Sequence, residues 1–123
     1  MGRGEDKLAV QVGPKGYFGQ VTLEAEPVDS DGEVNVDFAP TISKRWQSGA
    51  SFGIQYVLEH IAKREMFPKG GRVRVLNIGW HPVDTNNTVI AFVAAHALSK
   101  ALGIQPAKLP VFDKDTGVFS FPK

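Results

Sequence analysis

The side chains best suited to chemistry in this chain lie in one polar segment, His81 to Asn86. An imidazole and a carboxylate stand three positions apart there, at His81 and Asp84, so they could orient each other as an acid–base pair. Such a pair more often makes a loop hydrogen bond that fixes a turn. The other two histidines, His60 and His96, fall within predicted helices, where we expect surface or boundary positions rather than metal ligands.

Signatures of catalysis and of cofactor binding are missing from the sequence. No serine has a histidine and an aspartate arranged as in a nucleophilic triad. The phosphate-loop pattern GxxxxGK[ST] does not occur, and the glycines of residues 13–19 lead into a predicted strand rather than a helix, so we expect no nucleotide triphosphate. Without cysteine there is no thiolate zinc site. We therefore predict a protein that is not an enzyme and has no catalytic residue, cofactor or metal.

Composition is that of an ordinary soluble domain. The 123 residues are 42% apolar and 22% charged, which fits one domain over residues 1–123 with a two-layer core. There is no secretory signal pattern, no possible disulfide and no apolar run of membrane-spanning length. These features predict a cytoplasmic protein without a membrane partner.

The net charge of +1 conceals a segregation of charge along the chain. Residues 16–43 carry six acids and no base, whereas residues 44–123 carry eleven bases and five acids. Strands that expose acids and other elements that expose lysines would explain this pattern. Alternatively, one basic face could attract phosphate groups and lie apart from an acidic face.

The elements that must position the polar segment begin with three strands. Apolar residues alternate with polar ones in residues 8–12, 21–26 and 34–38, and turn residues separate the three runs. We expect a hairpin turn at residues 27–32 and an antiparallel meander with one solvated face. Met1 to Asp6 is predicted to be a frayed end.

Two helices and a fourth strand complete the predicted core. A helical stripe runs from Ile54 to Ala62, and a strand follows at residues 73–78. A second helix starts at a cap on Asn87 or Thr88 and stops at Gly103; its apolar stripe comprises Ile90, Val93, Ala94, Ala97, Leu98, Ala101 and Leu102. The register of residues 44–53 is left open, since their glycines disfavour a helix.

The resulting order, β-β-β-α-β-α, predicts an α+β two-layer sandwich in which two helices cover one face of a mostly antiparallel sheet. The core spans about residues 7–103, and an extra C-terminal tail occupies about residues 104–123. This tail contains Phe119 and Phe121, which we expect to dock on the sheet edge or on another subunit.

Three motifs occur in the order known from one family. The first is Lys15-Gly16-Tyr17-Phe18-Gly19-Gln20-Val21, followed by a strand that ends in Glu26-Pro27. The second is Gly53-Ile54-Gln55, and the third is Gly79-Trp80-His81-Pro82-Val83-Asp84-Thr85-Asn86, followed by Ala91-Phe92 and an alanine-rich helix. From about Lys7 to Gly103 the chain therefore resembles the fourth domain of elongation factor G, the ribosomal translocase.

This resemblance implies a fold like the second domain of ribosomal protein S5, with three strands, a helix, a strand and a helix, and an unusual left-handed crossover. In the family, two loops form a tip that contacts transfer RNA and messenger RNA. Carried over by position, the tip loops comprise Lys15, Gly16, Tyr17, Phe18, Gly19, Gln20, His81, Val83, Asp84, Thr85 and Asn86. The expected partner is a ribosome or a structured RNA, because glycines let backbone approach ribose-phosphate while aromatic and amide groups stack and bond.

The sequence departs from the family at several points. Gln20 replaces the usual histidine, and Lys44-Arg45-Trp46 stands where the family has a glycine pair with isoleucine and proline. The GTPase and the other translocase domains are missing, so the resemblance predicts a stand-alone, non-catalytic RNA- or ribosome-binding module. One alternative is a homo-oligomeric interaction module that uses the phenylalanine-rich tail, and another is an enzyme that uses His81 and Asp84.

Overall fold

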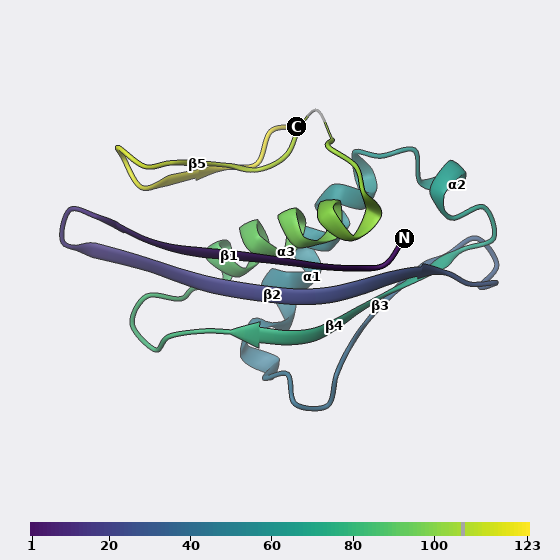
Figure 1. Cartoon of the computed structure of the whole chain (residues 1–123), viewed down its shortest axis with the longest axis horizontal. Coiled ribbons are helices and arrows are strands. Elements are labelled where there is room, and N and C mark those ends of the chain that lie inside the picture. Colours follow the sequence, from purple (N-terminus) through teal and green to yellow (C-terminus); the bar gives the residue numbers. More distant parts are fainter. Residues whose placement is uncertain (107) are drawn as a thin grey trace.

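Four strands form a mixed sheet in the order β1-β2-β4-β3 (Figure 1). The computed structural model describes residues 1–106 and 108–123. Strand β1 (Arg3–Val12) pairs antiparallel with β2 (Lys15–Pro27), which pairs antiparallel with β4 (Gly71–Gly79). Strand β3 (Val34–Phe38) lies parallel to β4 at the sheet edge. Side chains alternate along each strand, so one face is apolar and faces the helices.

Two long helices cover that apolar face. Helix α1 (Lys44–Glu59) starts at Ser43, whose hydroxyl accepts a hydrogen bond from the Arg45 N–H. A single short turn, α2 (Lys63–Met66), follows it. Helix α3 (Asn87–Leu102) is capped by the Asn86 side chain and ends at Gly103, whose φ of 68° is the left-handed stop that glycine favours. The predicted α+β two-layer fold is therefore confirmed.

The two helices meet at close range because glycine lies at their contact. A Cβ added to Gly53 of α1 would overlap the carbonyl oxygen of Ala91 in α3. Gly49 of α1 is similarly tight against Asn87, and its N–H donates to the Asn87 Oδ1 at 3.2 Å. Packing between helices thus overrides the low helix propensity of glycine, which is why α1 begins at Lys44 and not near residue 54.

The predicted meander is wrong in its third strand. Val36 of β3 pairs with Val73 of β4, and no strand pairing joins β3 to β2 in the described part of the chain. Helix α1 lies between β3 and β4 in the chain and carries it back to the same end of the sheet. Strand β4 therefore runs parallel to β3. Residues 28–33 are therefore a connection across the end of the sheet and not a hairpin turn.

The predicted frayed end is also wrong, because β1 begins at Arg3 and pairs with Glu24. Gly4 helps to explain why these first residues are ordered. It lies against the backbone of α3, where a Cβ would overlap the carbonyl oxygen of Ala97. The Lys100 ammonium of α3 lies 2.8 Å from the Asp6 carboxylate and donates to the Glu5 carbonyl oxygen at 3.1 Å. Tertiary contacts thus order the chain's first residues.

The tail folds back on the helices of its own chain. Strands β5 (Val111–Asp113) and β6 (Val118–Ser120) form an antiparallel hairpin, drawn in yellow beside α3 in Figure 1. Phe119 packs edge-on against Phe92 of α3, and Phe121 packs against Phe52 and Tyr56 of α1. Phe119 therefore docks on α3 and on Tyr17 at the start of β2, whereas Phe121 docks on α1. The predicted docking on the sheet thus holds in part for Phe119 and is wrong for Phe121.

Candidate functional site

The two segments predicted to form a tip lie side by side at one end of the sheet. The first segment was expected to be a loop, but after a turn at Gly13 it is the start of β2, with Lys15 paired to Val12. The second segment is a turn between β4 and α3. The backbone N–H of Phe18 donates to the carbonyl oxygen of Asp84 at 3.0 Å, which joins them directly.

Thr85 provides the second link between the segments. Its hydroxyl donates to the carbonyl oxygen of Phe18 at 2.7 Å and accepts from the backbone N–H of His81 at 2.8 Å. Only 7% of Thr85 is exposed. A buried hydroxyl with both partners in place fixes the turn relative to β2.

Gly16 and Gly19 allow the close approach of the two segments. A Cβ on Gly16 would lie 2.7 Å from the Asp84 Oδ2, and one on Gly19 would lie 2.7 Å from the Val89 Cγ1. Side chains at these positions would push the turn and α3 away from β2. In this chain both glycines therefore serve internal packing.

The aromatic residues of β2 point to opposite faces of the sheet, as strand alternation requires. Tyr17 lies under the tail, with its ring centroid 5.4 Å from Phe112 and 5.7 Å from Phe119. Phe18 lies on the open face, where the Lys7 ammonium is 5.5 Å from its ring centroid. The tail thus covers the ring that a two-loop tip would present.

Gln20 and Asn86 hold the site together through their amides. The Gln20 Oε1 accepts from the Gly79 N–H at 3.1 Å and from the Asn77 side chain at 3.2 Å. The Asn86 Oδ1 accepts from the Val89 N–H at 2.9 Å and so caps α3. Both amide oxygens are therefore engaged within the protein.

The exposed side chains of the two segments include Lys15, His81 and Val83, together with Pro82 and Asn86. The His81 side chain is 56% exposed and Val83 is 82% exposed. A shallow hollow of about 310 Å³ lies next to them, lined by Ala9, Val10, Gln11, Gly16, Tyr17, Phe18 and Asp84. The site thus presents a cation, an imidazole, an amide and apolar side chains to solvent beside a small depression.

His81 and Asp84 do not form a hydrogen-bonded acid–base pair. The His81 Nδ1 is 3.9 Å from the Asp84 Oδ2, which exceeds hydrogen-bond distance. The Nδ1 instead accepts a hydrogen bond from the Val83 N–H at 3.3 Å. The imidazole therefore stabilises the turn.

The other two histidines bond to backbone carbonyl oxygens: His60 to Tyr56 at 2.7 Å and His96 to Pro110 at 2.8 Å. Within residues 1–106 and 108–123, no group of three or more histidine, aspartate or glutamate side chains is placed to hold a metal ion. In the same described part, no helix has the length and apolarity needed to cross a membrane.

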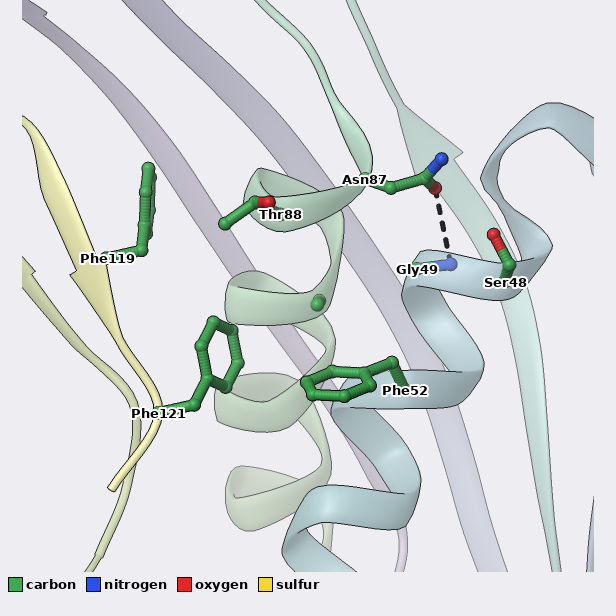
Figure 2. Close-up of a pocket in the computed structure, with 8 residues that line it drawn as sticks. Ser48, Gly49, Phe52, Asn87, Thr88, Phe119 and Phe121 are labelled. Carbon is green, nitrogen blue, oxygen red and sulfur yellow. Dashed lines mark hydrogen bonds between the residues drawn. The ribbon is translucent and has the colours of Figure 1, made fainter. Parts of the chain in front are cut away.

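Sequence reasoning missed an apolar pocket of about 370 Å³ between the helices and the tail (Figure 2). The rings of Phe52 and Phe121 meet edge to face there, with centroids 5.5 Å apart, and Phe52 is 57% exposed. The signal lay in residues 44–53, whose helical register the sequence left open. The complete lining is Ser48, Gly49, Phe52, Asn87, Thr88, Ala91, Phe119 and Phe121.

Comparison with known proteins gives a match in fold. Neither protein-family models nor curated proteins provide a match to the chain. Among solved structures, the crystal structure of the protein ttk003000868 from Thermus thermophilus matches with a TM-score of 0.67 at 25% identity. The match covers 83% of this chain and 16% of that chain. The chain therefore shares its fold with a small part of a longer protein.

Proposed function

We propose that this chain is a non-catalytic RNA- or ribosome-binding module that resembles the fourth domain of elongation factor G and acts through its tip. The observation that carries the proposal is the link between Phe18 and the turn at Asp84 and Thr85. The resemblance requires two segments far apart in sequence to share one end of the domain. Their hydrogen bonds meet this requirement, which composition alone does not impose.

The structure narrows the set of side chains available for contact. Lys15, His81 and Val83 are exposed at the tip, while Gly19 and Thr85 are buried beneath them. In this proposal the Lys15 ammonium binds phosphate and the His81 ring meets a base or ribose, supported from below by the buried residues. The Tyr17 ring takes no part while the tail covers it.

The similarity to the Thermus thermophilus protein supports a modular role. The match covers 16% of that chain, so this fold occurs there as a part of a longer protein. A cytoplasmic location belongs to the proposal, because ribosomes and messenger RNA are found there.

Co-sedimentation with ribosomes at low and moderate salt tests the proposal. We expect binding that weakens as salt rises, because phosphate contacts release counterions, and that falls in Lys15→Ala and His81→Ala. Lys63→Ala provides a matched control, since Lys63 is an exposed lysine on α2, which lies away from the β1–β2 turn (Figure 1). Binding that is equal in all three variants would exclude the tip as the contact surface.

A homo-oligomeric interaction module is the second candidate, and one observation favours it. Val111 and Val118 are 56% and 54% exposed on the outer face of the tail hairpin. A two-stranded sheet also leaves both its edges open to pairing with another strand. Light scattering of the purified protein should then report a dimer that Val111→Ser with Val118→Ser converts to monomer. A monomer at all concentrations would remove this candidate.

A further inference from the structure

A cluster of three side chains lies where α1 begins, beside the turn of the tip. The Arg45 guanidinium carbon is 4.7 Å from the centroid of the Trp46 ring and 5.8 Å from that of the Trp80 ring. The two indole rings are 5.7 Å apart and tilted by 50°. These are the distances of cation–π and aromatic contacts, so the three side chains support one another.

The two tryptophans of this cluster differ in exposure. Trp46 is 2% exposed and belongs to the core, whereas Trp80 is 45% exposed. The buried indole of Trp46 therefore packs against the Trp80 indole and supports it from the core side. A large ring held in place by two neighbours yet open to solvent is suited to stacking, because little side-chain freedom is lost on binding.

The charged side chain next to the Trp80 ring is the cation of Arg45. Lys44 and Arg45 are both exposed, and the first turn of α1 carries no acid. Among the residues that the structure describes, neither Lys44 nor Arg45 lies within 4.0 Å of a carboxylate. An exposed aromatic ring with the Arg45 cation beside it, and the exposed Lys44 next in the chain, attracts an anionic ligand that has a flat apolar part.

Trp80 is continuous with the tip, since it directly precedes His81 and follows Gly79. The Gly79 N–H is bonded to the Gln20 side chain of β2 at 3.1 Å. The cluster therefore borders the segment that carries His81.

We propose that Trp80 is a base-stacking platform for single-stranded RNA, with Arg45 beside it and the neighbouring Lys44 of α1 as the phosphate contacts. This inference rests on the proposed RNA-binding function and adds a site and a ligand class to it. Unpaired bases stack on aromatic side chains while basic residues follow the backbone. Paired bases in a double helix do not expose their faces, so single strands are the ligand that fits.

Trp fluorescence tests this platform directly, because the chain contains only two tryptophans. In Trp46→Phe the emission comes from Trp80 alone. We expect a twelve-nucleotide oligouridylate or oligoadenylate to quench this emission on binding, and a polyphosphate of equal charge to leave it unchanged. If Trp46→Phe unfolds, the difference between the native protein and Trp80→Phe gives the same signal.

Affinity measurements complete the test. Trp80→Ala should weaken oligonucleotide binding by about tenfold or more, and Trp80→Phe, which keeps a flat ring, by less. Phe52→Ala is the matched control, since Phe52 is an exposed aromatic residue of α1 that lies in the pocket toward the tail. Equal affinity of Trp80→Ala and the native protein, or equal quenching by polyphosphate and oligonucleotide, would overturn the platform.

The failure of this inference can be separated from failure of the tip. Quenching of Trp80 that persists while Lys15→Ala and His81→Ala leave ribosome binding unchanged would support the platform and reject the tip. Ribosome binding that depends on Lys15 and His81, without quenching by either oligonucleotide, would overturn the platform alone. In that case Trp80 faces protein or solvent in the bound state.

Discussion

The hydroxyl of Thr85 donates to the carbonyl oxygen of Phe18 at 2.7 Å and so joins the turn before α3 to the first strand pair. The same hydroxyl accepts from the His81 N–H, so one buried side chain fixes both the turn and its position on β2. The exposed residues of the tip are placed by this link. Its loss should therefore affect stability and RNA binding together.

Replacing Thr85 by valine keeps the shape of the side chain and removes both hydrogen bonds. We expect a loss of about 1–3 kcal/mol in the free energy of unfolding, because the Phe18 carbonyl oxygen and the His81 N–H lose this partner at a partly buried site. Urea denaturation measures the change. Thr85→Ser keeps the hydroxyl and should lose much less. Equal stability of the two variants would show that the link is not a stabilising contact.

Gly53→Ala decides between helix propensity and packing in α1. Propensity alone predicts that alanine stabilises the helix by about 1 kcal/mol. The structure predicts the opposite sign, since the new Cβ would overlap the carbonyl oxygen of Ala91 and drive α1 from α3. Thermal unfolding should show a lower melting temperature. Gly2→Ala is the control, because nothing lies within 4 Å of a Cβ there; a stabilised Gly53→Ala would contradict the helix contact.

These contacts explain how far the sequence alone could lead. The alternation of Val21, Leu23 and Ala25 and the stripe on α3 depend only on local periodicity, so these elements were predictable. The pairing of β3 was not predictable from the sequence. The residues of β3 alone do not indicate that a later strand, β4, will lie between β2 and β3. The early start of α1 was hidden for a related reason: its glycines are favourable only once α3 lies against them.

The candidate site shows the same division. The motifs around Phe18 and Asp84 predicted which segments meet, because the resemblance supplied their shared end of the domain. They did not predict that Gly16 serves packing against Asp84 or that Thr85 is buried. The sequence also did not predict that the tail covers the Tyr17 ring, because the fold that the resemblance implies has no counterpart of the tail.

Phe119→Ala tests how firmly the tail holds its cover over Tyr17. The Phe119 ring contacts Tyr17, Phe92 and Phe112, so its loss should reduce the free energy of unfolding by about 2 kcal/mol. The phenol of Tyr17 should also be nitrated faster by tetranitromethane. Val118→Ala is the neighbouring control, because Val118 is 54% exposed and should change neither quantity. Unchanged nitration in Phe119→Ala would mean that Phe112 alone is sufficient to cover the ring.

Stability at high pH should report on Tyr56, which ties the tail to α1. Its hydroxyl donates to the carbonyl oxygen of Lys108 at 2.6 Å, and burial raises its pKa above the ordinary value of 10.0. The unfolded state therefore loses this proton at a lower pH than the folded state does. Below pH 10.0 both states keep the proton and the contribution of Tyr56 is complete; as the pH rises above that value, ionisation favours the unfolded chain and stability falls. Urea unfolding between pH 8 and pH 11, a range that brackets the ordinary tyrosine pKa of roughly 10, measures how the free energy of unfolding changes with pH.

Tyr56→Phe removes the ionising group, so the free energy of unfolding of this variant should fall less steeply over the same pH range. Parallel curves for the two proteins would exclude Tyr56 as the cause.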